Sequence, residues 1–286
     1  MRSLMRILVI ARLTFLEAAR RKIMLAAVLL GIVFLAVYGI GYYYIVREIR
    51  LTEVNMPLAV RHQIFNFLML AGLYVVNFLT VMMTVLTSVD TLSGEISTGT
   101  IHTLLAKPLR RWELVLGKWL GFGGMLSLYL ILMGGGVLVL VYLLSAYQPP
   151  HPFVAMGLLW LNALLLLTIS FAGGSVLSTL ANGVLVFGLF GVAFLGGWIE
   201  QVGSYLPSQS ASQTAMNIGV VTSLLLPSEA LWKRAAHELQ SPLAGMLGFS
   251  PFSPANYPSN LMIVYAAGYL LVIFFLALRW FQNRDL

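Results

Sequence analysis

The chain has 286 residues, of which 59% are hydrophobic and only 9% are charged. Soluble domains carry about 25% charged residues, so most of this chain must face lipid rather than water. Disordered proteins are excluded as well, because they are poor in aromatic residues and 12% of this chain is Phe, Trp or Tyr. The absence of cysteine excludes disulfides, thiolate metal sites and cysteine nucleophiles.

Residues 1–22 predict an amphipathic helix that lies flat on the inner membrane surface. Apolar residues recur at helical spacing on one stripe and charged residues occupy roughly the other face. The stripe comprises Leu4, Ile7, Leu8, Ala11, Phe15 and Ala18, and the charged face comprises Arg2, Arg6, Glu17, Arg20 and Arg21. Such a helix buries its apolar face at the headgroup boundary. The alternative is that the basic leader only sets the topology.

Six segments are long and apolar enough to cross a bilayer, which requires about 20 residues. They comprise residues 23–45, 64–89, 119–145, 153–177, 183–199 and 260–278. The segment 183–199 is short and follows its predecessor closely, which predicts a tight helical hairpin. The sequence therefore predicts an all-α membrane protein, in which residues 23–286 form a single domain with six transmembrane helices.

The Lys and Arg residues are distributed unequally between the two sides of the membrane. Most lie in residues 1–22, 90–118 and 279–286, and few lie in the loops of the other side. The positive-inside rule places both termini in the cytoplasm of a cell, inner or plasma, membrane. Anionic membrane lipid satisfies basic residues at this surface, so nucleic-acid binding is not indicated.

Residues 200–259 form a proline-rich outer segment. Its apolar stretch 215–226 is too short to cross the membrane, which predicts a re-entrant or interfacial element before the last span. Residues 228–240 predict a short surface helix in which Glu229 and Lys233 are spaced for an ion pair within the helix. Acidic residues on this side are expected singly in loops, namely Glu48, Glu53, Glu200, Glu229 and Glu238.

The spans lack the chemistry of several protein classes. They contain none of the acidic, basic or histidine residues that mark proton relays and ion-coupled carriers, and no carboxylate pair for acid–base catalysis. The four histidines lack metal-ligand spacing, so neither a metal nor a cofactor is expected on this chain. No G-x-x-x-x-G-K-[ST] phosphate loop is present. We therefore expect no enzyme, and nucleotide hydrolysis would require another chain.

The inner loop 90–118 carries the most informative pattern. Gly99 can end the helix that extends the second span, and Ser97 to Thr100 offer capping groups for a new helix. Ile101, Leu104 and Leu105 would form an apolar face on that helix, and Pro108 would end the helix. From Arg111 an amphipathic helix leads into the third span. The loop thus predicts a short helix parallel to the membrane.

This loop resembles the membrane-spanning permease subunits of type-2 ABC transporters, which are typically exporters. Their signature is a Glu, Gly-Thr, a Leu-Leu-x-Lys-Pro turn, an Arg, a Glu and a Gly-Lys. The matching residues are Glu95, Gly99, Thr100, Leu104, Leu105, Lys107, Pro108, Arg111, Glu113, Gly117 and Lys118. The leader, with Phe15, Glu17, Arg20 and Arg21, resembles the connecting helix of that family. Within that family, the overall character of the sequence is most similar to the permeases linked to maturation of copper enzymes.

The resemblance implies a permease subunit that forms the translocation pathway with a second copy or a paralogue. A dimer of cytoplasmic ABC ATPase subunits would bind ATP and Mg²⁺. The residues that couple to this partner would be Glu95, Thr98, Gly99, Thr100, Ile101, Leu104, Leu105, Lys107, Pro108 and Arg111. One alternative is a membrane scaffold or anchor that recruits a cytoplasmic partner without transport. Another, a lipid-modifying enzyme, lacks a carboxylate pair.

Overall fold

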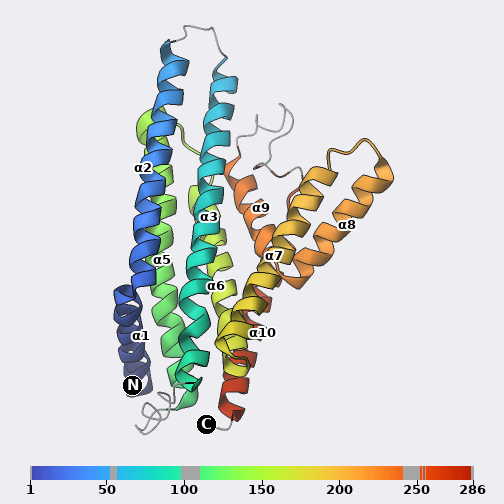
Figure 1. Cartoon of the computed structure of the whole chain (residues 1–286). Coiled ribbons are helices and arrows are strands. Elements are labelled where there is room, and N and C mark those ends of the chain that lie inside the picture. The colour runs from blue at the N-terminus through green and yellow to red at the C-terminus, as the bar shows by residue number, and fades with distance from the viewer. Residues whose placement is uncertain are drawn as a thin grey trace.

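The computed structural model describes residues 2–51, 57–97, 110–240, 252, 254 and 256–284. Every regular element within these ranges is a helix (Figure 1). The helices are α1 (Arg2–Arg20), α2 (Lys22–Leu51), α3 (Leu58–Ser97), α5 (Arg111–Ser145), α6 (Pro152–Val176), α7 (Thr179–Gly203), α8 (Gln209–Leu225), α9 (Ser228–Leu239) and α10 (Asn260–Asn283). In this part of the chain six of them, α2, α3, α5, α6, α7 and α10, are long and apolar enough to cross a membrane. The predicted all-α membrane fold is therefore confirmed.

The central helices of the bundle are α3 and α6. Of their most apolar stretches, 61% and 67% of the residues are buried, against 11% in α2 and 17% in α10. Both chain termini lie at the same end of the bundle, which we call the termini end (Figure 1). Because isolated helices satisfy their own backbone hydrogen bonds, the outward apolar faces of α2 and α10 are compatible with lipid contact.

The helices are longer than the predicted spans. With 40 residues, α3 is about 60 Å long, about twice the thickness of the hydrocarbon core. The segment expected at 183–199 is the 25-residue helix α7. The predicted boundaries stop at the first charged residue, whereas in the structure Asp90 and Glu95 continue α3 and Lys118 lies within α5.

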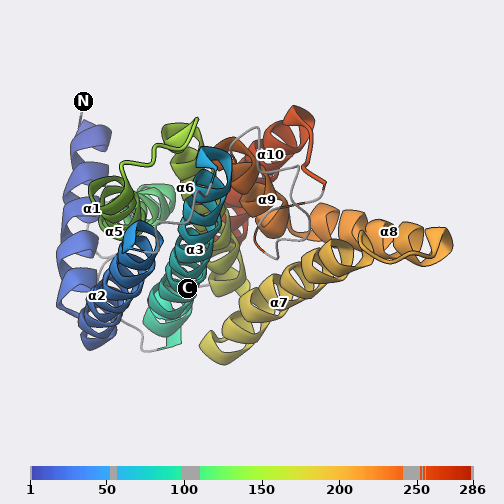
Figure 2. The same ribbon diagram turned by 90° about the horizontal axis from the view of Figure 1, so that it is seen from above.

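The helix α1 crosses the side of the bundle at the termini end, transverse to the long helices (Figures 1 and 2). It packs against α5, where Gly117 and Gly121 allow close approach. A Cβ atom at Gly121 would lie 2.6 Å from the carbonyl oxygen of Ala11. The face against α5 includes Ile7, Thr14 and Ala18, whereas the exposed apolar face comprises Leu4, Met5, Leu8, Val9, Leu13 and Leu16. The prediction of one apolar stripe was therefore wrong, because α1 has two apolar faces.

The hairpin of α7 and α8 leans away from the bundle (Figures 1 and 2). At residues 226–227 the chain bends by 108° between α8 and α9, and α9 returns toward the end opposite the termini (Figure 1). Such a bent pair is either a broken span or a re-entrant element, so the re-entrant or interfacial element expected before the last span stays a prediction.

The prediction that residues 228–240 form a surface helix was wrong. Within α9, Leu231 and Trp232 are only 1% and 3% exposed, because the helix packs against α6, α3 and α7. Lys233 pairs with Glu200 of α7 at 2.6 Å and not with Glu229. The acidic residues expected in loops lie in helices wherever the structure describes them: Glu48 in α2, Glu200 in α7, and Glu229 and Glu238 in α9. Glu53 lies outside the described residues.

Candidate functional site

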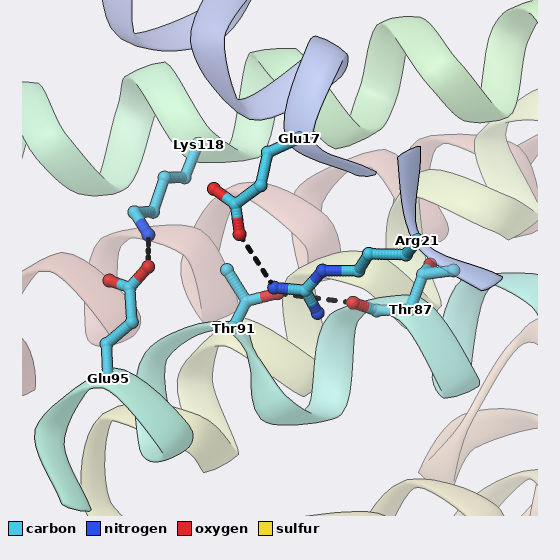
Figure 3. Close-up of polar contacts among 6 residues, drawn as sticks. All are labelled: Glu17, Arg21, Thr87, Thr91, Glu95 and Lys118. Atoms are coloured by element: carbon cyan, nitrogen blue, oxygen red, sulfur yellow. Dashed lines mark hydrogen bonds and ion pairs between the residues drawn. The ribbon is translucent and has the colours of Figure 1, made fainter. Parts of the chain in front are cut away.

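A cluster of polar side chains joins α1, α3 and α5 at the termini end. We call it the basal cluster; it comprises Glu17, Arg21, Thr87, Thr91, Glu95 and Lys118 (Figure 3). Glu17 lies in α1, and Arg21 occupies the single-residue break between α1 and α2. The threonines and Glu95 lie on consecutive turns of α3, and Lys118 projects from α5. The cluster therefore brings polar side chains of α1, α3 and α5 close together.

The ion pair between Lys118 and Glu95 is the more buried of the two ion pairs in this cluster. The Lys118 ammonium donates to Glu95 Oε1, and the side chains are 7% and 19% exposed, respectively. Removal of one partner would leave a charge in a poorly hydrated place, which destabilises proteins far more than loss of a surface pair. The pair thus fastens the end of α3 to the beginning of α5.

The second ion pair of the cluster is more exposed. Arg21 donates to Glu17 at 3.0 Å across one turn, with side chains 30% and 60% exposed, so this pair contributes little stability. Thr91 Oγ1 donates to the carbonyl oxygen of Thr87 at 3.2 Å (Figure 3). The space between these side chains is too small for a water molecule. The basal cluster is therefore packed and holds no ligand cavity.

A second anchor holds the first turn of α1 against α5. Glu113, which is 1% exposed, accepts a hydrogen bond from Ser3 Oγ at 2.6 Å and lies 3.7 Å from the Arg6 guanidinium. It also accepts the backbone N–H of Arg110 at 3.1 Å, which caps α5. Hence Glu113, recognised in the sequence only as part of a motif, fixes both α1 and the start of α5.

Arg111 connects α5 to the end of the last helix. Its guanidinium donates to the carbonyl oxygens of Gln282 at 3.0 Å and Arg284 at 2.6 Å, and Arg284 donates to the carbonyl oxygen of Ser175 in α6 at 2.6 Å. Cations at helix C-termini satisfy free carbonyl groups. Arg284 was missed as a site residue, because a basic residue near a chain end indicated only topology.

The remaining predicted residues fall into two groups. Phe15 of the proposed connecting helix is partly buried against the core, and Arg20 is exposed. Eight predicted coupling residues lie outside the described residues, namely Thr98, Gly99, Thr100, Ile101, Leu104, Leu105, Lys107 and Pro108. Both flanks of that segment are nevertheless fixed, by Glu95 on one side and by Arg110, Arg111 and Glu113 on the other.

The side chains at the termini end connect helices and do not form a recognisable catalytic or metal-binding site in the described residues. Within the ranges that the structure describes, no group of three or more His, Asp or Glu residues gathers to hold a metal ion. The basal cluster contains neither a nucleophile paired with a base nor an open cavity. Its Lys118–Glu95 pair joins α3 to α5, and α1 is held to α5 by the contacts of Ser3 and Arg6 with Glu113.

Comparison with known proteins assigns the chain to a family. The sequence model of ABC-2 family transporter proteins matches residues 8–286, nearly the whole chain. No curated protein matches the sequence. The match does not address the copper-enzyme subgroup, which stays a prediction.

Proposed function

Because the chain belongs to the ABC-2 transporter family, we propose that it is the permease subunit of an ATP-driven exporter whose ATPase is a separate cytoplasmic chain. In this proposal two permease subunits form the pathway, the termini end faces the cytoplasm, and residues 98–109 contact the ATPase. ATP and Mg²⁺ are held by that partner.

One observation carries the coupling proposal: contacts with neighbouring helices hold the residues on both flanks of the segment 98–109. On its N-terminal side Glu95 is fixed to Lys118, and on its C-terminal side Arg111 and Glu113 are fixed to α10 and α1. A push on the segment would therefore move α3 and α5 together with α1. Packed helices respond to such a push by hinge or shear motion.

In this proposal Glu95 stabilises the end of α3 and does not itself contact the ATPase. Its side chain is directed at Lys118, so we infer that Glu95 braces the end of α3 and that residues 98–109 supply the contact with the ATPase. Replacement of the brace would then uncouple the two subunits without separating them.

The test uses the absence of cysteine in the chain. Single cysteines at two exposed positions, Leu58 in α3 and Val202 in α7, carry spin labels, and the distance between them is measured with the ATPase bound, with and without a non-hydrolysable ATP analogue. We expect the distance distribution to change on nucleotide binding. In the brace variant Glu95→Gln with Lys118→Met, the ATPase should remain bound and the change should disappear.

The same measurement separates transport from scaffolding. A scaffold recruits its partner without moving its own helices, so its distance distribution would be identical with and without nucleotide. That outcome, obtained with a bound and active ATPase, would contradict the permease proposal. A matched control is Arg50→Gln, because Arg50 donates to the carbonyl oxygen of Leu144 at the opposite end of the bundle.

A further inference from the structure

A second group of largely buried charges lies where the first turns of α9 meet α7. Glu229 and Lys233 of α9 are 7% and 5% exposed, and Lys233 donates to Glu200 of α7 at 2.6 Å. We call these three residues the α7–α9 charge cluster. When both carboxylates are ionised, this cluster has one negative charge more than Lys233 neutralises.

The surplus charge lies on Glu229. In the part of the chain that the structure describes, neither a hydrogen bond nor an ion pair reaches its carboxylate. The side chain lies directly against α7, where a Cβ atom at Gly197 would collide with Glu229 Cγ. A buried ion without a counter-charge is strongly disfavoured. Burial raises the pKa of Glu229 to about 7, so near neutral pH protonation removes part of the surplus charge, and a bound cation would stabilise the ionised carboxylate.

The carboxylate borders a pocket with aromatic walls. Besides Glu229, its lining includes Tyr74, Trp198, Trp232 and Phe252 and also Lys233, whose ammonium is paired with Glu200. The ring of Tyr74 lies 4.9 Å from that of Trp232 and 6.4 Å from that of Trp198, and the Trp198 indole N–H donates to the Tyr74 hydroxyl at 2.7 Å. Aromatic faces attract cations. The free space accommodates about one water-sized group.

We propose that this pocket binds a primary ammonium group, with Glu229 as its counter-charge and Tyr74, Trp198 and Trp232 as its aromatic wall. A primary ammonium group is close to water in size, whereas a trimethylammonium group exceeds the available space. Its three N–H donors also match a carboxylate acceptor. The ligand of the pocket is therefore an amine, either soluble or the headgroup of an aminophospholipid.

The test uses methylammonium chloride and the intrinsic tryptophan fluorescence of the purified full chain. We expect a saturable change in emission that sodium chloride at equal ionic strength does not produce. The change should be reduced in Trp232→Phe, which assigns it to this pocket. Glu229→Gln should weaken binding by about tenfold or more, because it removes a charge-assisted hydrogen bond. The matched control is Glu238→Gln, since Glu238 lies on the same helix but pairs with Arg234 at 2.7 Å.

Two outcomes would overturn the proposal: a response shared equally by sodium, or an unchanged affinity in a folded Glu229→Gln variant. If Glu229→Gln does not fold, Glu229→Asp keeps the charge and retracts it by one methylene group, so binding must weaken there instead. In nanodiscs the ligand source is then resolved. If the fluorescence changes without added amine in phosphatidylethanolamine but not in phosphatidylcholine, the ligand is the lipid headgroup. If the change requires added methylammonium in both lipids, the ligand is a soluble amine.

Discussion

Lys118 in α5 and Glu95 in α3 form a largely buried ion pair at the termini end, and in the chain they lie on opposite sides of the loop proposed to contact the ATPase. A buried pair is weak evidence for stability compared with apolar packing, but removal of one partner alone is costly. The relationship between these two residues therefore predicts strongly coupled mutations.

We expect Lys118→Met and Glu95→Gln to destabilise the protein individually by about 2–3 kcal/mol, because each leaves the other polar group without its partner. The double variant should lose much less than the sum. Thermal unfolding in detergent, analysed as a double-mutant cycle, measures the coupling. If the two losses add, the ion pair does not hold α3 to α5.

Gly121→Leu should release α1 from α5, because the added side chain would meet the Ala11 carbonyl oxygen and Thr14; overpacking of this kind costs about 1–3 kcal/mol. A cysteine placed at buried Thr14 reports the release through maleimide labelling, and no native cysteine interferes. Labelling should be slow in the parent and fast after Gly121→Leu. Gly135→Leu is the control, since no atom lies within 4 Å of a Cβ there, and equal rates in all three proteins would count against the contact.

Asn182 should be important for attachment of α7. Its amide donates to the carbonyl oxygens of Val89 in α3 and Ser170 in α6 at 3.1 and 2.9 Å. Interhelical hydrogen bonds in membranes contribute about 0.6 kcal/mol on average and up to about 1.7. We expect Asn182→Ala to lower unfolding stability by about 1–2 kcal/mol, because two such bonds are lost together. Asn217→Ala in exposed α8 should have no effect in the same thermal assay; similar losses for both would contradict this assignment.

The two halves of the Glu200–Lys233 pair should differ in their sensitivity. After Glu200→Gln, Lys233 still has Glu229 one turn away on its own helix, so the loss should be small. After Lys233→Met, the buried Glu229 and the partly buried Glu200 both lose their cation, so the loss should be about 3 kcal/mol or more. Comparison of the two thermal midpoints checks this order. If Glu200→Gln lowered the thermal midpoint more than Lys233→Met, Glu229 could not replace Glu200 as the ion-pair partner of Lys233.

The six spans and the family were predictable because each depends on local sequence. Long apolar runs identify helices that cross a bilayer, and the loop from Glu95 to Lys118 carries its residues at fixed spacing. Helix ends were less predictable, since Glu95 and Lys118 interrupt apolar runs but continue their helices once paired with each other.

Contacts between distant segments could not be predicted. The spacing of Glu229 and Lys233 favours a pair within one helix, yet Lys233 selects Glu200, 33 residues away. Similarly, the apolar pattern of α1 does not distinguish a face that contacts α5 from one that contacts lipid. Both cases depend on which neighbouring helix covers a given helix face. The sequence of one amphipathic helix does not identify that neighbour.

The central claim is that residues 98–109 engage a separate ATPase. The most direct measurement is purification of the tagged chain in mild detergent, with mass spectrometry of the proteins that accompany it. We expect a stoichiometric chain containing a G-x-x-x-x-G-K-[ST] loop, its loss after Leu104→Glu with Leu105→Glu, and its retention after Leu51→Glu at the opposite end of the bundle. If no such ATPase accompanies the parent chain with or without ATP, or if the loop variant retains it, the account is contradicted.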